Sequence, residues 1–134
     1  MQREIQEVQP AVKLLRMVLS GETVNASAGR WNFSNFNNPQ TIIAIFENGS
    51  AIYQFSVGIK DKDVTFYNTH REAEQGFGTP SLQSCEEILR LLSENDQKRI
   101  RLVFPSFDQQ DTIKWLLKNG YKTEDGKEFY KDMF

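Results

Sequence analysis

The chain has 134 residues, of which 39% are hydrophobic and 25% are charged, and its formal net charge at pH 7 is -2. These values predict one globular domain over residues 1–134 rather than a disordered chain. They argue against a protein that mainly binds long nucleic acid, because such binding needs an excess of basic residues to displace the counterions of the phosphate backbone.

With one cysteine, Cys85, and one histidine, His70, the chain has neither an intrachain disulfide nor a closed zinc site made of these residue types. The segment Met1–Glu7 is too polar for a signal peptide, and no apolar run approaches the roughly 20 residues of a membrane-spanning helix. We therefore expect a cytoplasmic protein with no membrane partner, no bound metal and no cofactor.

The first predicted element is a helix, because apolar residues recur at helical spacing at Val8, Val12, Leu15 and Leu19. Pro10 either opens this helix or kinks an earlier turn, and Gly21 suits the position just after its end. Glu22–Val24 is a candidate short strand.

Residues 25–39 combine three aromatic residues, Trp31, Phe33 and Phe36, with five asparagines. This segment is too aromatic for a plain linker and too rich in asparagine for a regular strand, because asparagine favours turns. We therefore expect an irregular segment here.

Three antiparallel strands are predicted next, at residues 41–46, 51–58 and 64–68. Asn48-Gly49 is typical of a type I′ hairpin turn, which needs positive φ at both central residues. The polar sequence Lys60–Asp63 predicts the second turn.

The second half of the chain alternates helices and strands. Thr79-Pro80-Ser81 predicts the start of a helix, since proline is favoured in a first turn. A strand is predicted at residues 99–104. The apolar face of the helix comprises Leu82, Cys85, Ile88, Leu89 and Leu92.

A third helix is predicted after Asp108, which can act as its N-cap, with Asp111 in the favourable first turn. Asp125-Gly126 predicts a terminal hairpin between residues 121–123 and 128–130. Together these elements predict an α+β fold with three helices and a mixed or mostly antiparallel sheet of four to six strands. In the third helix, the residues expected to face inward are Ile113, Leu116 and Leu117, and Trp115 is expected to lie at an edge. Gly120 is expected to end this helix.

The first candidate binding segment, residues 70–81, leaves a strand and enters a helix. Glycines before the helix let the backbone approach a ligand closely, and a helix N-terminus attracts phosphate. The structural alternative is a glycine-rich turn capped by Thr79, with Phe77 in the core. The candidate ligand contacts are His70 and Arg71 for phosphate, Phe77 for a base, and Gly78, Thr79 and Ser81 at the helix start.

The second candidate segment is residues 30–36. Arg30 can pair with phosphate in a fixed fork, Trp31 and Phe33 can stack on a base, and asparagine amides can read the edge of adenine. The structural alternative is a loop that holds its aromatic residues over the sheet.

Catalytic groups are scarce, and no catalytic residue is predicted. His70 has no serine or aspartate partner at a recognisable spacing, and Cys85 lies on an apolar helix face, which suits a buried, unreactive thiol. The acidic residues fall in turns and on helix surfaces, where carboxylates are usually solvated. Examples are Asp61, Asp63, Glu86, Glu87 and Asp125.

The second half of the chain resembles the GNAT acyltransferases, in which a glycine-rich loop holds the pyrophosphate of acetyl-CoA. That family has Arg or Gln three residues before the first glycine, where this chain has Ala73. The matching parts are Val64–Asn68, Gly76-Phe77-Gly78, the helix from Ser81, Arg99–Phe104, the helix from Gln109, and Lys118-Asn119-Gly120-Tyr121.

The whole chain also resembles the phage anti-Thoeris sponges, non-catalytic oligomers that sequester cyclic ADP-ribose-like signals. The resemblance lies in the segment Asn25–Phe33, the Asn48-Gly49 hairpin and the loop Gln75–Ser81. It implies non-catalytic binding, a homo-oligomer and, for a phage-encoded protein, the host cytoplasm.

Both resemblances imply an adenine nucleotide diphosphate at residues 70–81, the segment that the residues themselves indicate. We therefore expect a protein that sequesters a small, phosphate-bearing ligand of adenine nucleotide type without turnover. The alternatives are an acyl-CoA-dependent acyltransferase, and a protein-binding inhibitor that presents Trp31, Phe33 and Phe36 as an aromatic anchor.

Overall fold

The structure, a computed structural model, describes residues 2–35, 42–48, 51–71 and 79–133. Within these ranges the chain forms three helices and a mixed sheet, which confirms the predicted α+β class. The elements are α1 (Gln2–Leu19), β1 (Asn25–Ala28), β2 (Trp31–Ser34), β3 (Ile42–Asn48), β4 (Ala51–Lys60), β5 (Asp63–Arg71), α2 (Thr79–Asp96), β6 (Arg101–Pro105), α3 (Gln110–Lys118), β7 (Lys122–Thr123) and β8 (Glu128–Asp132).

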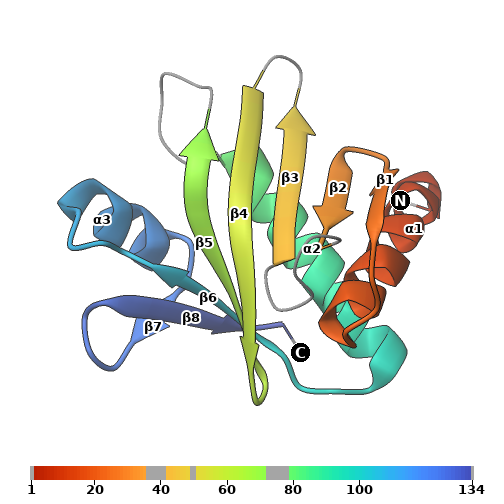
Figure 1. The fold of residues 1–134 in the computed structure, drawn as a ribbon. Helices are drawn as coiled ribbons and strands as arrows, with labels where there is room; N and C mark the ends of the chain where they lie inside the picture. The colour runs from red at the N-terminus through yellow and green to blue at the C-terminus, as the bar shows by residue number, and fades with distance from the viewer. Residues whose placement is uncertain (1, 36–41, 49–50, 72–78, 134) are drawn as a thin grey trace.

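The described strands form one sheet in the order β1-β2-β3-β4-β5-β6-β8-β7 (Figure 1). This sheet has eight strands, so the predicted four to six is too few. Its neighbouring strands are antiparallel except β5 and β6, which are parallel and connected through α2. These two strands pair at three positions, from Asp63 with Arg101 to Thr65 with Val103, and then diverge.

The two strands missed from the sequence are β1 and β2, in the asparagine-rich segment. They form a hairpin around Gly29, which has a φ of 60°, and β2 pairs with β3. Trp31 and Phe33 are buried while Asn32 and Ser34 are half-buried, so the polar residues occupy alternate positions on the other face. The prediction of an irregular segment is therefore wrong for residues 25–34, because this alternation outweighs the turn preference of asparagine.

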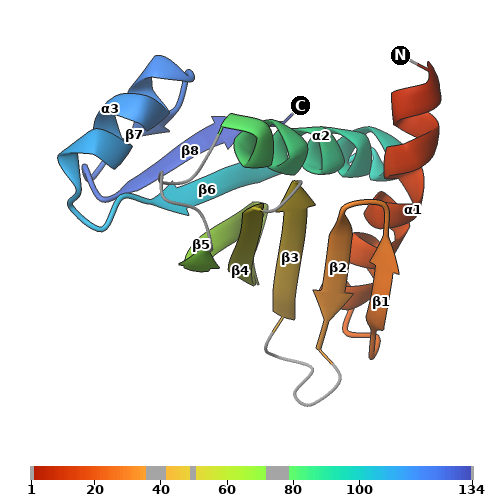
Figure 2. The same ribbon diagram turned by 90° about the horizontal axis from the view of Figure 1, so that it is seen from above.

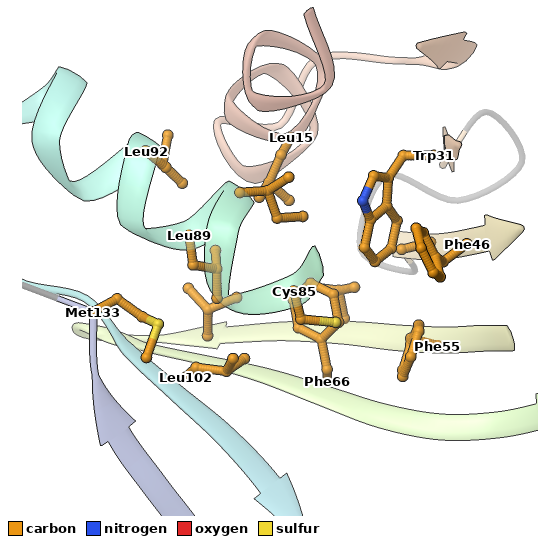
Figure 3. Close-up of a cluster of buried hydrophobic side chains, with 14 of the residues drawn as sticks. Leu15, Trp31, Phe46, Phe55, Phe66, Cys85, Leu89, Leu92, Leu102 and Met133 are labelled. Carbon is orange, nitrogen blue, oxygen red and sulfur yellow. The ribbon is translucent and has the colours of Figure 1, made fainter. Parts of the chain in front are cut away.

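Helices α1 and α2 lie against one face of the sheet (Figure 2). In β4 the buried residues Tyr53, Phe55 and Val57 alternate with half-buried Gln54 and Ser56, as expected for a strand covered on one face. Figure 3 shows the core between the layers, where Leu15 of α1 and Leu89 of α2 face the sheet residue Phe66.

The predicted glycine ends of two helices are confirmed. Gly21 follows α1 with a φ of 92°, and the N–H of Glu22 donates to the carbonyl of Met17 at 3.1 Å. Gly120 follows α3 with a φ of 90°, and both ends show the hydrogen bonds of a Schellman motif. Pro10 lies inside α1, which begins at Gln2, so it does not open this helix.

The segment before β1 and the β3–β4 hairpin each differ in part from what the sequence predicts. Residues 22–24 precede β1 and form no strand of their own. The predicted hairpin between β3 and β4 is confirmed, but Asn48 pairs with Ala51 and so belongs to the strands rather than to the turn centre. Gly49 lies outside the described residues.

Two predictions about α3 are wrong. Gln109, not Asp108, is the N-cap residue, and it makes no side-chain capping hydrogen bond. Leu117 is 52% exposed, because it lies about 100° around the helix from the buried Leu116. The predicted terminal hairpin is confirmed, with Gly126 at a φ of 75° between β7 and β8.

Among the helices of the described ranges, none combines the length and the apolar character that a membrane crossing requires.

Candidate functional site

A pocket of about 510 Å³ opens between α1, the β1–β2 turn and the first turns of α2. Val8 and Ala11 of α1 form one wall. Arg30 in the turn contributes a cation, and it is exposed. The part of α2 that borders the pocket is polar and comprises Gln83, Ser84 and Glu87.

Arg30 and Trp31 of the second candidate segment border this pocket, and on α2 its described lining begins at Gln83, two residues after the first candidate segment ends. The indole Nε1 of Trp31 donates a hydrogen bond of 2.8 Å to the Oγ of Ser84. Ser84 lies three residues after Ser81, within the second turn of α2, so the β1–β2 hairpin contacts the beginning of the helix. This contact joins parts of the chain 53 residues apart.

Trp31 and Phe33 lie in the core rather than on an accessible surface. Phe33 is 0% exposed and Trp31 is 3% exposed. The Trp31 ring lies 5.5 Å from Phe33, 5.0 Å from Phe46 and 6.2 Å from Phe66, measured between centroids (Figure 3). Neither ring offers a free face for stacking on a base, so the placement agrees with the structural alternative that these aromatic residues cover the sheet.

The asparagine amides of this hairpin also bond within the protein. Asn35 is buried; its Oδ1 accepts from the Val24 N–H at 2.7 Å and its Nδ2 donates to the Glu22 carbonyl at 2.8 Å. Asn32 donates to the Ser27 hydroxyl at 2.9 Å. Asn35 therefore fixes the exit of the hairpin to the segment before β1.

Residues of the first candidate segment are placed by strand register and helix position. His70 lies opposite Gln54 and Arg71 lies opposite Tyr53. Since neighbouring strand positions alternate between faces, the His70 and Arg71 positions belong to opposite faces of the sheet. Thr79 and Ser81 lie in the first turn of α2. Phe77 and Gly78 lie outside the described residues.

One row of paired residues connects the two segments across the sheet. Trp31 pairs with Phe46, Phe46 with Tyr53, and Tyr53 with Arg71. Three strand steps of about 4.8 Å place the Arg71 position about 14 Å from that of Trp31. The Arg71 position thus lies in the same row of paired residues as Trp31, three strands away.

Cys85 is confirmed as a buried thiol on the apolar face of α2. Burial and the neighbouring Glu86 charge raise its pKa well above the usual value, so the thiol stays protonated and is a poor nucleophile. Within the described ranges, no group of three or more His, Cys, Asp or Glu side chains is arranged to hold a metal ion.

Glu86 is a polar residue whose role the sequence analysis missed. It is 8% exposed, not solvated, and its Oε2 accepts hydrogen bonds from the Tyr121 hydroxyl at 2.8 Å and from Lys131 Nζ at 3.2 Å. A signal was present, because Glu86 follows Leu82 by four residues and precedes Leu89 by three, which is the spacing of the buried face. Burial and the Glu86 charge also raise the pKa of Tyr121 far above its usual range, which keeps the hydroxyl a hydrogen-bond donor.

Asp63 is a second carboxylate that is paired rather than simply solvated. Arg101 donates to its two oxygens at 2.6 and 2.8 Å, and the guanidinium lies 4.6 Å from the centre of the Tyr130 ring. This fork lies where β5 and β6 begin to pair.

No protein-family model and no curated protein sequence matches this chain. The fold and the pocket describe an α+β protein with α1 and α2 on one face of an eight-stranded mixed sheet, and with a pocket between these helices and the β1–β2 turn that has both apolar and polar lining residues.

Proposed function

We propose that the protein binds a small, phosphate-bearing ligand of adenine nucleotide type in the pocket beside Arg30 and holds it without turnover. The observation that carries this proposal is the Trp31–Ser84 hydrogen bond, which holds the β1–β2 hairpin and its Arg30 against the beginning of α2 beside one pocket. Trp31 acts here by positioning the hairpin and not by stacking.

The chemistry of the pocket wall supports this class of ligand. A volume of about 510 Å³ lies within the range of small-molecule sites, roughly 300 to 1,000 Å³. Arg30 provides a fork for phosphate, and the nearby N-terminal end of α2 carries partial positive charge. Ser84 and Gln83 can donate or accept hydrogen bonds, and Glu87 can accept one from a ribose hydroxyl or an adenine amino group.

Binding without turnover is favoured by what borders the pocket. Its described wall contains no cysteine or histidine, and Glu87 is its one carboxylate. The resemblance to phage sponges gives such a protein a biological setting, the sequestration of a cyclic ADP-ribose-like signal during counter-defence. Holding a ligand intact needs complementarity to the ground state alone, whereas catalysis needs groups that act in the transition state.

An acyl-CoA-dependent acyltransferase is the second candidate, and one observation favours it. The described elements β5, α2, β6, α3 and the β7–β8 hairpin follow one another in the order that the resemblance to GNAT acyltransferases implies. In open α/β sheets, ligands bind beyond the carboxyl ends of parallel strands, and α2 begins beyond that end of β5. Acetyl-CoA would bring the same adenine nucleotide diphosphate to this end of the sheet.

The test is calorimetric titration with cyclic ADP-ribose, ADP-ribose, ADP and acetyl-CoA, followed by denaturation and mass analysis of the recovered ligand. We expect one adenine nucleotide to bind and to be recovered unchanged. Because Arg30 would make charged hydrogen bonds, Arg30→Ala should weaken binding about tenfold to a hundredfold. Lys114→Ala, which removes an exposed cation from α3, is the control and should bind like wild type.

Two results would contradict the proposal. If none of the four ligands gave a heat of binding, the pocket would not be a nucleotide site. Loss of the acetyl group from acetyl-CoA in the presence of an amine would identify the acyltransferase instead.

A further inference from the structure

A second pocket, of about 180 Å³, lies where α1 and α2 end, beside the β4–β5 turn. Its apolar lining includes the buried residues Val64, Leu92 and Ile100, together with Ile59, which is 52% exposed. Engineered apolar cavities of roughly 150 Å³ accept a benzene molecule. The pocket therefore has the size and lining for one aromatic ring.

The rim of this pocket is positively charged. Arg16 and Asp96 pair with each other at 2.9 Å across the ends of the two helices. The other charged residues of the lining are three cations, Lys62, Lys98 and Arg99, and one carboxylate, Asp61. A ring that carries a carboxylate beside it matches both the apolar lining and the excess of positive charge.

The chain itself presents such a group on another part of its surface. Phe107 is 60% exposed and is followed by Asp108, which is also exposed. Both residues have left-handed backbone, with φ values of 52° and 57°. This conformation is unfavourable for residues with a bulky side chain, and such strain is often retained where it serves a function.

The loop that carries Phe107 is fixed by its buried neighbour. Ser106 is 0% exposed, and its N–H donates to the Lys127 carbonyl at 2.8 Å. Its Oγ accepts from the Asp108 N–H at 3.2 Å. The ring and the carboxylate are therefore held on the surface by ordered backbone, so that little conformational entropy is lost when they bind.

We propose that the pocket lined by Ile59 receives Phe107 and Asp108 of a second copy of this chain. The loop before α3 and the β4–β5 turn lie at different ends of the molecule, so a copy does not fill its own pocket (Figure 1). The contact joins two different surfaces, so it is head-to-tail and builds a ring or an open chain of copies. It is independent of the nucleotide site beside Arg30.

The experiment measures the average mass by sedimentation over a range of protein concentrations. Wild type should associate, and Phe107→Ala and Ile59→Glu should each raise the dissociation constant at least about tenfold, as expected for an anchor residue. Leu117→Ala removes an equally exposed apolar side chain from α3 and should associate like wild type. Circular dichroism checks that each variant is folded.

A mixture gives the sharper readout. Phe107→Ala retains the pocket and Ile59→Glu retains the ring, so an equal mixture of the two should form dimers that grow no further. Higher salt should weaken the contact, because the rim charges are screened. A wild type that stays monomeric at every concentration, a Phe107→Ala variant that associates like wild type, or a mixture that stays monomeric would each overturn the proposal.

Discussion

At the scale of single residues, Glu86 is a buried carboxylate whose hydrogen bonds connect separate parts of the fold. It lies on α2, while its partners Tyr121 and Lys131 lie after α3 and on β8. Lys131 also donates to the carbonyl of Asn119 at 3.0 Å. Removing Glu86 takes away the acceptor that Tyr121 and Lys131 share, and the loss of one member of such a buried group costs more than the net value of the interaction.

We expect Glu86→Ala to lower the free energy of unfolding by about 3 kcal/mol, because Lys131 and Tyr121 then lose their shared acceptor. Urea unfolding followed by circular dichroism measures the change. Glu94→Ala, an exposed carboxylate on the same helix, is the control and should stay within about 0.5 kcal/mol of wild type. Equal stability of the two variants would show that the Glu86 group contributes nothing.

At the scale of elements, the C-terminal ends of the three helices share one hydrogen-bond pattern, but the residue with positive φ is not of the same type in all three. After α2, the N–H of Lys98 donates to the Ser93 carbonyl at 3.1 Å, the same pattern as after α1 and α3. The residue with positive φ is Gln97, at 53°, where the other two helices have Gly21 and Gly120. The end of α2 therefore carries backbone strain that glycine would remove.

Gln97→Gly should accordingly stabilise the protein by up to about 1 kcal/mol, since glycine adopts left-handed backbone without a Cβ penalty. Gly120→Ala is the matched change in the opposite direction. A Cβ at that position would meet Lys131 Cε at 3.7 Å, an ordinary contact, so its cost of about 1 kcal/mol comes from the backbone. Thermal unfolding should shift upward for the first variant and downward for the second; shifts of the same sign would contradict this explanation.

At the scale of the whole molecule, two parts of the sheet are connected by a short joint, the parallel pairing of β5 with β6. Strands β1–β5 form one antiparallel part and β6–β8 another, and the parallel pairing of β5 with β6 spans three positions. The Asp63–Arg101 fork lies at the first of these positions. A bidentate ion pair adds geometric specificity as well as energy, so it fixes the register in which β5 pairs with β6.

For this joint we expect Arg101→Lys to lower stability by about 1 kcal/mol, because an ammonium group cannot reproduce the fork or the contact with Tyr130. Both side chains are between a quarter and a third exposed, which keeps the effect small. Arg99→Lys, two residues earlier and exposed, should leave the urea midpoint unchanged. A midpoint for Arg101→Lys equal to that of Arg99→Lys would mean that the charge alone is sufficient.

The sequence alone was sufficient for several features that depend on a local pattern. The helical spacing of Leu82, Cys85 and Leu89 predicted the buried face of α2, and the glycines at 21 and 120 predicted two helix ends. These signals are strong because spacing and φ preference act within a few residues. For the candidate site, the sequence singled out Arg30, which borders the pocket, and the start of α2 at Thr79 and Ser81. The part of α2 in the described lining comes slightly later, at Gln83, Ser84 and Glu87.

Tertiary structure decided the rest, because it depends on contacts between distant residues. Asparagines 25, 32 and 35 favour turns locally, yet the pairing of β2 with β3 and the burial of Trp31 make a hairpin of this segment. The Trp31–Ser84 hydrogen bond spans 53 residues, and the Glu86 group joins α2 to β8 and to Tyr121, which lies between α3 and β7. The sequence thus determined which faces are apolar and where two of the helices end, while the contact of the β1–β2 hairpin with the beginning of α2 depended on long-range packing, whose free energy outweighs local preference.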